Sequence, residues 1–181
     1  MNKKVGIIIG TRPEAIKLIP IYIALKNSNT FETTLISTGQ HKEMLTQIFS
    51  IFNIEATIEL EVMTNNQSLS SLTAKLTDAL NQVYEEKKFD LIIVQGDTTT
   101  AFTAGLVAFY HKIKVAHVEA GLRTYDNYSP FPEEVNRKMI SCFANYHFAP
   151  TEKASNALNK ENANNVFTVG NTVIDLSLIH I

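Results

Sequence analysis

Short runs of apolar, largely β-branched residues alternate with longer amphipathic stretches along the chain. The short runs predict strands, and the amphipathic stretches between them predict helices. The predicted strands lie at residues 5–9, 32–36, 91–94, 113–118, 146–149 and 166–169. The predicted helices lie at residues 13–26, 42–52, 69–88, 99–110, 132–144 and 151–160. Regular alternation of this kind is typical of an α/β protein.

Several predicted strands are apolar at every position rather than at every second one. Such strands are buried on both faces, which is typical of a parallel sheet covered by helices on two sides. We therefore expect a Rossmann-like fold in one domain that spans residues 1–170. Residues 171–181 resemble the beginning of another element, and we expect that the chain is truncated there.

Length, composition and charge narrow the function class. With 181 residues, 45% of them hydrophobic, the chain suffices for one packed domain. Its net charge is −2, and it has no run of five basic residues. These features indicate neither nucleic acid nor an anionic membrane surface as a partner, so we expect a small ligand. The apolar run at residues 5–9 is too short for a secretory signal or a membrane span, which favours a cytoplasmic protein.

The cysteine content of the chain excludes an internal disulfide and a zinc-binding cysteine pattern. The single cysteine, Cys142, excludes an internal disulfide and fits a reducing compartment. We expect Cys142 to be a buried helix residue rather than a nucleophile, and the spacing of ligand residues contains no zinc pattern.

Three carboxylates stand where an apolar run gives way to a loop or a helix start. They are Asp97, Glu119 and Glu133. In an open α/β sheet, side chains beyond the carboxyl ends of the strands face the ligand crevice. These positions predict a site of acid–base chemistry.

Two of the three carboxylates also have a purely structural interpretation, and the third, Glu119, favours a functional one. Asp97 is a good N-cap for the helix that follows it. Glu133 and Glu134 complement the positive end of a helix dipole. Glu119 closes an apolar strand and has no helix to cap, so it needs Arg123, a ligand or water as a partner. Nearby His117 is more often a core residue than a catalyst.

The loop after the first strand has the sequence Gly-Thr-Arg-Pro-Glu at residues 10–14. Glycine permits a tight turn, and Pro13 suits the first turn of a helix. Arg12 and Lys17, near the free amides of that helix start, are suited to a diphosphate or a developing negative charge. Alternatively, Arg12 only pairs with Glu14. The loop matches neither the dinucleotide-binding nor the Walker pattern, so neither NAD nor ATP is indicated.

Six ordered sequence blocks together resemble the non-hydrolysing UDP-N-acetylglucosamine 2-epimerases. They are Gly-Thr-Arg-Pro-Glu-Ala-Ile-Lys at 10–17, Thr-Gly-Gln-His at 38–41, Gly-Asp-Thr-Thr-Thr at 96–100, His-Val-Glu-Ala-Gly-Leu-Arg-Thr at 117–124, Pro-Glu-Glu-x-Asn-Arg at 132–137 and Gly-Asn-Thr-Val-Ile-Asp at 170–175. The resemblance covers only the family's N-terminal half. It implies a GT-B-like protein whose second Rossmann-like domain is missing here, and a homodimer in the full-length form.

By resemblance, the catalytic acids are Asp97, Glu119 and Glu133, and the residues suited to the diphosphate are Arg12, Lys17 and Arg137. The resemblance places Gln40 and His41 beside the site where some bacterial members bind a second UDP-N-acetylglucosamine as an activator. A basic residue that assists there is replaced by Asn66. A further family histidine would lie beyond the end of this chain.

The activity that the resemblance implies interconverts UDP-N-acetylglucosamine and UDP-N-acetylmannosamine. UDP leaves sugar carbon 1 as carbon 2 loses its proton. UDP then adds back to carbon 1, and carbon 2 receives a proton on its opposite face. No cofactor or metal is needed. The alternatives that stay open are a hydrolysing epimerase, a GT-B glycosyltransferase, and a non-catalytic half-site that binds a sugar or a partner.

Overall fold

The computed structural model describes residues 2–39, 42–64 and 66–174. Within these ranges it contains one parallel sheet of seven strands in the order β3-β2-β1-β4-β5-β6-β7. The strands are β1 (Lys3–Ile9), β2 (Phe31–Ser37), β3 (Ile58–Glu59), β4 (Leu91–Gln95), β5 (Lys114–Val118), β6 (Tyr146–Ala149) and β7 (Val166–Thr168). The expected Rossmann-like α/β fold is confirmed.

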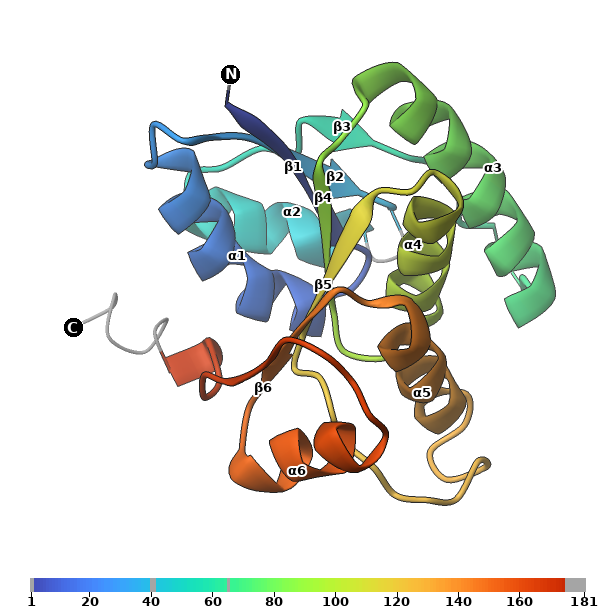
Figure 1. Ribbon diagram of the computed structural model, residues 1–181. Helices are drawn as coiled ribbons and strands as arrows, with labels where there is room; N and C mark the ends of the chain where they lie inside the picture. Colours follow the sequence, from blue (N-terminus) through green and yellow to red (C-terminus); the bar gives the residue numbers. More distant parts are fainter. Residues whose placement is uncertain (1, 40–41, 65, 175–181) are drawn as a thin grey trace.

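Helices follow the strands and cover both faces of the sheet. They are α1 (Arg12–Lys26), α2 (Lys42–Ile51), α3 (Leu69–Lys87), α4 (Thr99–Tyr110), α5 (Glu133–Phe143) and α6 (Glu152–Lys160). Figure 1 shows α1 and α2 on one side of the central strands and α3, α4 and α5 on the other. Among the described helices, none combines the length and apolar character needed to cross a bilayer.

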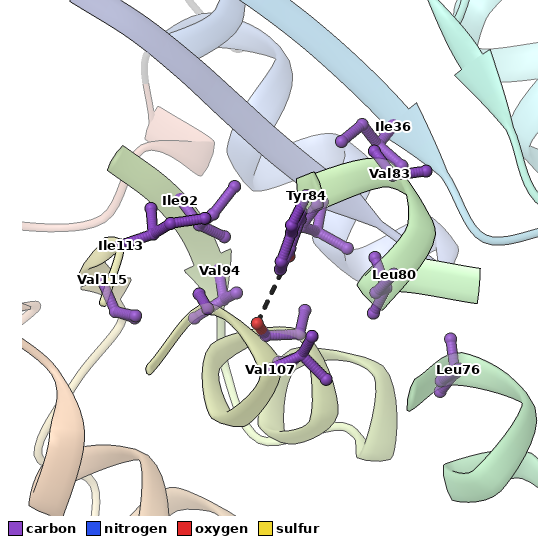
Figure 2. Close-up of a cluster of buried hydrophobic side chains, with 14 of the residues drawn as sticks. Ile36, Leu76, Leu80, Val83, Tyr84, Ile92, Val94, Val107, Ile113 and Val115 are labelled. Atoms are coloured by element: carbon purple, nitrogen blue, oxygen red, sulfur yellow. Dashed lines mark hydrogen bonds between the residues drawn. The ribbon is translucent and has the colours of Figure 1, made fainter. Parts of the chain in front are cut away.

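The sheet separates two hydrophobic cores, because successive strand residues point to opposite faces. On one face, Ile7, Leu35 and Ala116 pack with side chains of α1 and α2. On the other face, Ile92 and Val115 pack with side chains of α3 and α4 (Figure 2). The apolar character of both faces explains why these strands lack a polar–apolar alternation.

The core beneath α3 and α4 contains one buried tyrosine, Tyr84. Its hydroxyl donates a hydrogen bond of 3.3 Å to the carbonyl of Ala104, which is the dashed line in Figure 2. Burial of a phenol without such a partner is costly, so this bond stabilises the contact between the two helices.

All six predicted strands and all six predicted helices are present, with bounds that differ by no more than two residues. Strand β3 was not predicted, because its two residues pair only with the end of β2 and are too short to form a pattern. The expectation that Cys142 is buried was wrong: it lies in α5 but on the solvent side of that helix.

The sheet order brings two loops together. The chain runs outward from β1 to β2 and β3 and then returns to place β4 on the other side of β1. Strand order reverses at this point, so the loops after β1 and β4 meet at the carboxyl edge of the sheet, where an open α/β sheet has its crevice. Ligands of open α/β sheets bind at such a switch point.

Candidate active site

The residues of the site follow the carboxyl ends of three neighbouring strands of the sheet. Strand β1 leads into Gly10 and Thr11, β4 leads into Gly96 and Asp97, and β5 leads into Glu119. Gly96 and Glu119 both adopt left-handed backbone conformations, with φ of +70° and +63°. A non-glycine residue in that region costs roughly 1–2 kcal/mol, and such strain is common at functional sites.

Glu119 is held by two side chains from different elements. Its Oε2 lies 2.5 Å from Nζ of Lys17 on α1 and accepts a hydrogen bond from the side-chain amide of Gln95 at the end of β4. The Glu119 side chain retains 17% of its exposure, so it remains accessible from the crevice. Arg123, which the sequence offered as a partner, is paired instead with Glu161.

Asp97 faces α5. Its Oδ2 lies 2.7 Å from Nη2 of Arg137, and its backbone carbonyl accepts a 2.8 Å hydrogen bond from the Asn136 amide. The N-cap of α4 is Thr98, whose hydroxyl accepts the amide of Ala101. Because Thr98 performs the capping, Asp97 does not have the structural role that its position first suggested.

Electrostatics links all of these groups. Burial raises the pKa of Asp97, and the negative charges of Glu133 and Glu119 raise it further. The positive charges of Arg137 and Lys17 lower the same pKa. The three predicted carboxylates and two of the three predicted cations therefore act on one another at one place. A carboxyl group whose pKa is raised is suited to proton transfer near neutral pH.

The two acidic residues that open α5 have different surroundings. Glu133 is partly exposed at the first position of the helix. Glu134 is fully buried and accepts the backbone amides of Thr124 and Tyr125, each at 3.0 Å. Both favour the positive end of the helix dipole, but Glu134 also fixes the loop that precedes α5, whereas Glu133 is left beside Asp97.

The first loop does not pair Arg12 with Glu14. The buried Glu14 carboxylate accepts hydrogen bonds from the amides of Gly10 and Thr11, at 2.7 and 2.6 Å, and from the Thr98 hydroxyl at 2.6 Å. Arg12 is exposed and has no ion pair or hydrogen bond from its side chain to any residue in the described ranges. The interpretation that Arg12 only pairs with Glu14 is therefore wrong.

Gln40 and His41 lie outside the described residues. They follow Gly39, at the carboxyl end of β2, and precede the first residue of α2. Their assignment to an activator site, and the effect of Asn66 there, stay predictions.

His117 is a core residue that supports the site. Its ring is fully buried, and Nε2 lies 2.7 Å from the carbonyl oxygen of Gly96, to which it donates a hydrogen bond. Burial lowers the pKa of His117 to about 3, so the ring is neutral. A neutral, buried ring that contacts the Gly96 carbonyl holds the loop before Asp97 in place.

Sequence reasoning missed the supporting residues Gln95 and Glu14. Gln95 directly follows the predicted strand at residues 91–94 and is the last residue of the observed β4, so its position at the same edge as Glu119 was available from the pattern. Glu14 stands three residues after Thr11, which is the spacing of a capping box at a helix start. Asn136 carried no such signal, because its contact with Asp97 depends on how α5 packs.

Comparison with known proteins identifies the family. A family model described as UDP-N-acetylglucosamine 2-epimerase matches residues 23–181. The chain belongs to the UDP-N-acetylglucosamine 2-epimerase family. It is 48% identical over 178 residues to the UDP-N-acetylglucosamine 2-epimerase of Neisseria meningitidis serogroup A, covering 97% of this chain and 48% of that protein. The chain thus spans about half the length of the relatives it matches.

Solved structures agree with this assignment. A crystal structure of the Neisseria meningitidis epimerase bound to UDP-GlcNAc superimposes with a TM-score of 0.93 at 48% identity, over 97% of this chain and 49% of that one. The Methanocaldococcus jannaschii epimerase in complex with UDP-GlcNAc and UDP gives a TM-score of 0.90 at 40% identity, over 97% and 48% of the two chains. The expected architecture, a Rossmann-like fold that matches one half of these epimerase structures, is confirmed.

Proposed function

We propose that this chain supplies one wall of the active site of a non-hydrolysing UDP-N-acetylglucosamine 2-epimerase. The observation that carries the proposal is the grouping of Asp97, Glu119 and Glu133, each from a separate strand end or helix start, with Lys17 and Arg137. The relatives named above are UDP-N-acetylglucosamine 2-epimerases by name, and two of their structures hold UDP-GlcNAc, which supports an epimerase acting on this substrate.

The chemistry explains the need for several carboxylates. The hydrogen on sugar carbon 2 has no adjacent carbonyl, so its removal must accompany departure of UDP from carbon 1. A carboxylate oxygen takes the proton, the C–H electrons form a double bond between carbons 1 and 2, and UDP leaves with the electrons of the C–O bond. The reverse steps deliver a proton to the other face of carbon 2. Inversion therefore needs proton carriers on both faces of the ring.

We assign this proton transfer to Glu119 and Glu133, with Asp97 as a supporting base or orienting group. Asp97 and Glu119 each have a cation as partner, and burial raises the pKa of Asp97. A raised pKa favours the protonated form of Asp97, which fits a supporting or orienting role beside the two glutamates.

Three cations are suited to the leaving diphosphate. Arg12 is exposed at the start of α1, and its side chain has no partner in the described ranges. Lys17 is paired with Glu119, and Arg137 is paired with Asp97. Positive charge placed where a diphosphate leaves stabilises the transition state by several kcal/mol in typical cases, on the order of 3.

We propose that the rest of the site lies in the part of the family that this chain does not match. We propose that residues 1–170 form the first domain, that residues 171–181 begin the connection to a second one, and that the full-length protein is a homodimer. Closure of two domains excludes water and completes such sites.

Product analysis tests the proposal. The full-length protein that contains this chain is incubated with UDP-N-acetylglucosamine, and the products are followed by ¹H NMR at the anomeric position. We expect UDP-N-acetylmannosamine in equilibrium with the substrate, without any added cofactor. Free N-acetylmannosamine would instead indicate a hydrolysing epimerase, and turnover only with an acceptor would indicate a glycosyltransferase.

A further inference from the structure

The two donors that hold Glu119 both bind the same carboxylate oxygen. Lys17 Nζ and Gln95 Nε2 both contact Oε2. Across the described ranges, no hydrogen bond or ion pair reaches Oε1. The two oxygens of this carboxylate are therefore not equivalent: one is fixed by the protein, and the other is left for a ligand.

The position of Gln95 is built into the sheet. Gln95 is the last residue of β4 and is opposite Val118, the last residue of β5, in the parallel register. The amide of Gly96 donates to the Val118 carbonyl at 3.0 Å, so the two strand ends stay joined just before Glu119. Only 3% of Gln95 is exposed, which restricts its side chain to the position beneath the carboxylate.

The two donors differ in what they contribute. The Lys17 ammonium is a point charge on a flexible stem, and it stabilises the ionised carboxylate without fixing its plane. The Gln95 amide is uncharged and directional, and it is held by a strand rather than by a helix side chain. Hydrogen bonds lose strength steeply as their angle departs from linear, so the pair together restricts the rotation of the carboxylate.

We propose that Gln95 is a positioning residue for the epimerase reaction, and that Oε1 of Glu119 is the atom that exchanges the proton with sugar carbon 2. This inference rests on the proposed function. In the elimination step, Oε1 forms the new O–H bond while the C–H electrons become the double bond and UDP departs. Gln95 touches neither substrate nor the reacting atoms; it acts by keeping Oε1 directed toward the crevice.

Kinetics of variants of the full-length protein test the positioning role. Gln95→Leu removes the donor at similar volume, and Gln95→Glu keeps the shape but replaces the donor with an acceptor. Gln82→Leu, at an exposed position in α3, is the matched control. Because a misplacement of about 1 Å can cost roughly 100-fold in rate, we expect kcat to fall by about 10- to 100-fold in both Gln95 variants. KM should stay within about two-fold, and the control should match the wild type.

Rescue and spectroscopy separate positioning from a general structural role. Gln95→His restores a ring N–H donor of similar reach, so we expect it to recover most of the lost kcat. The side-chain amide signal of ¹⁵N-labelled Gln95 should move on Glu119→Ala substitution and stay in place in the control. This signal is measured without turnover, so it tests the contact even if the protein proves not to be an epimerase.

Each outcome has one meaning. An unchanged Gln95 amide signal in Glu119→Ala, or wild-type kcat in Gln95→Leu, overturns the inference. A rise in KM without a fall in kcat also overturns it, because Gln95 would then bind substrate. Absence of epimerisation in the wild type overturns the proposed function and with it the role of Gln95 in proton transfer, whereas the amide signal still decides whether the contact exists.

Discussion

At the scale of single residues, the site depends on surroundings that move two groups away from their ordinary protonation behaviour. Asp97 is pushed toward the protonated form chiefly by burial, and Arg137 resists that shift. His117 is pushed toward the neutral form by burial. Asp97 thereby becomes a better proton carrier, and His117 becomes a neutral hydrogen-bond donor in a fixed position.

Removal of the Arg137 charge should raise the pKa of Asp97 further. The guanidinium favours the ionised carboxylate, so Arg137→Met leaves burial and the neighbouring carboxylates unopposed except by Lys17. We expect ¹³C NMR of the Asp97 carboxyl carbon to show its titration at higher pH than in the wild type. Lys138→Met removes a cation of the same helix that pairs with Glu134, and it serves as the control. An identical Asp97 titration in Arg137→Met and wild type would contradict this reading.

The buried neutral His117 should make stability depend on pH in a defined window. The unfolded chain binds a proton at His117 below about pH 6.5, whereas the folded protein resists protonation until about pH 3. Stability is therefore complete above pH 6.5 and falls as the pH decreases, by at most about 1.4 kcal/mol per unit from this group.

His117→Gln provides the comparison for that window. The glutamine amide can still donate to the Gly96 carbonyl, but it does not titrate. Urea unfolding at pH 7, 6 and 5 should show a smaller loss of stability for this variant than for the wild type. Equal losses in the two proteins would show that His117 is not neutral when folded.

At the scale of elements, polar contacts join loops that apolar packing alone would leave loose. Glu14 ties the start of α1 to the loop after β4 through Thr98, and Asn136 ties that loop to α5. Glu134 ties α5 to the loop after β5. The site is therefore fixed by helix starts that contact strand ends.

The loop before α5 should become less stable when one of the two acceptor oxygens of the Glu134 carboxylate is replaced by a donor. Glu134→Gln keeps the shape but directs an NH₂ group at the amide of Thr124 or Tyr125. We expect destabilisation of roughly 1–3 kcal/mol, because a buried donor is left unsatisfied. Faster hydrogen exchange at these two amides measures the effect. Glu133→Gln is the matched control, and equal exchange in the two variants would refute the anchoring role.

The sequence predicted the strands and helices better than it predicted the contacts within the site. Apolar runs gave every strand except β3, because burial on both faces leaves an unambiguous pattern. The placement of Asp97 and Glu119 at strand ends also followed from the pattern. The partners of these two carboxylates could not be predicted from the pattern. The contact between Lys17 and Glu119 joins positions 102 residues apart, and only the strand order brings them together.

At the scale of the whole molecule, the described chain presents one side of a crevice. The chain matches about half of each relative, and the carboxylate group lies at the carboxyl edge rather than in an enclosed cavity. The active site proposed above needs a second wall to hold its nucleotide sugar and to exclude water.

We expect the 181-residue chain alone to be inactive and the full-length protein to be active. The chain contains the proposed proton carriers, whereas we propose that the closing surface comes from the half of the relatives that it does not match. ¹H NMR of UDP-N-acetylglucosamine with each protein at equal concentration measures the difference. Addition of the separately produced second half to the chain is the control, and it should restore part of the activity. Turnover by the isolated chain would contradict the requirement for a second wall.

Solvent deuterium incorporation at sugar carbon 2 tests the central claim most directly. The full-length protein and its Asp97→Asn, Glu119→Gln and Glu133→Gln variants are incubated with UDP-N-acetylglucosamine in D₂O. We expect the wild type to place deuterium at carbon 2. Glu119→Gln and Glu133→Gln should lose about 100- to 10,000-fold in the rate of this exchange, and Asp97→Asn should also be slower. Exchange at the wild-type rate in all three variants would contradict the assignment of these carboxylates to the reaction.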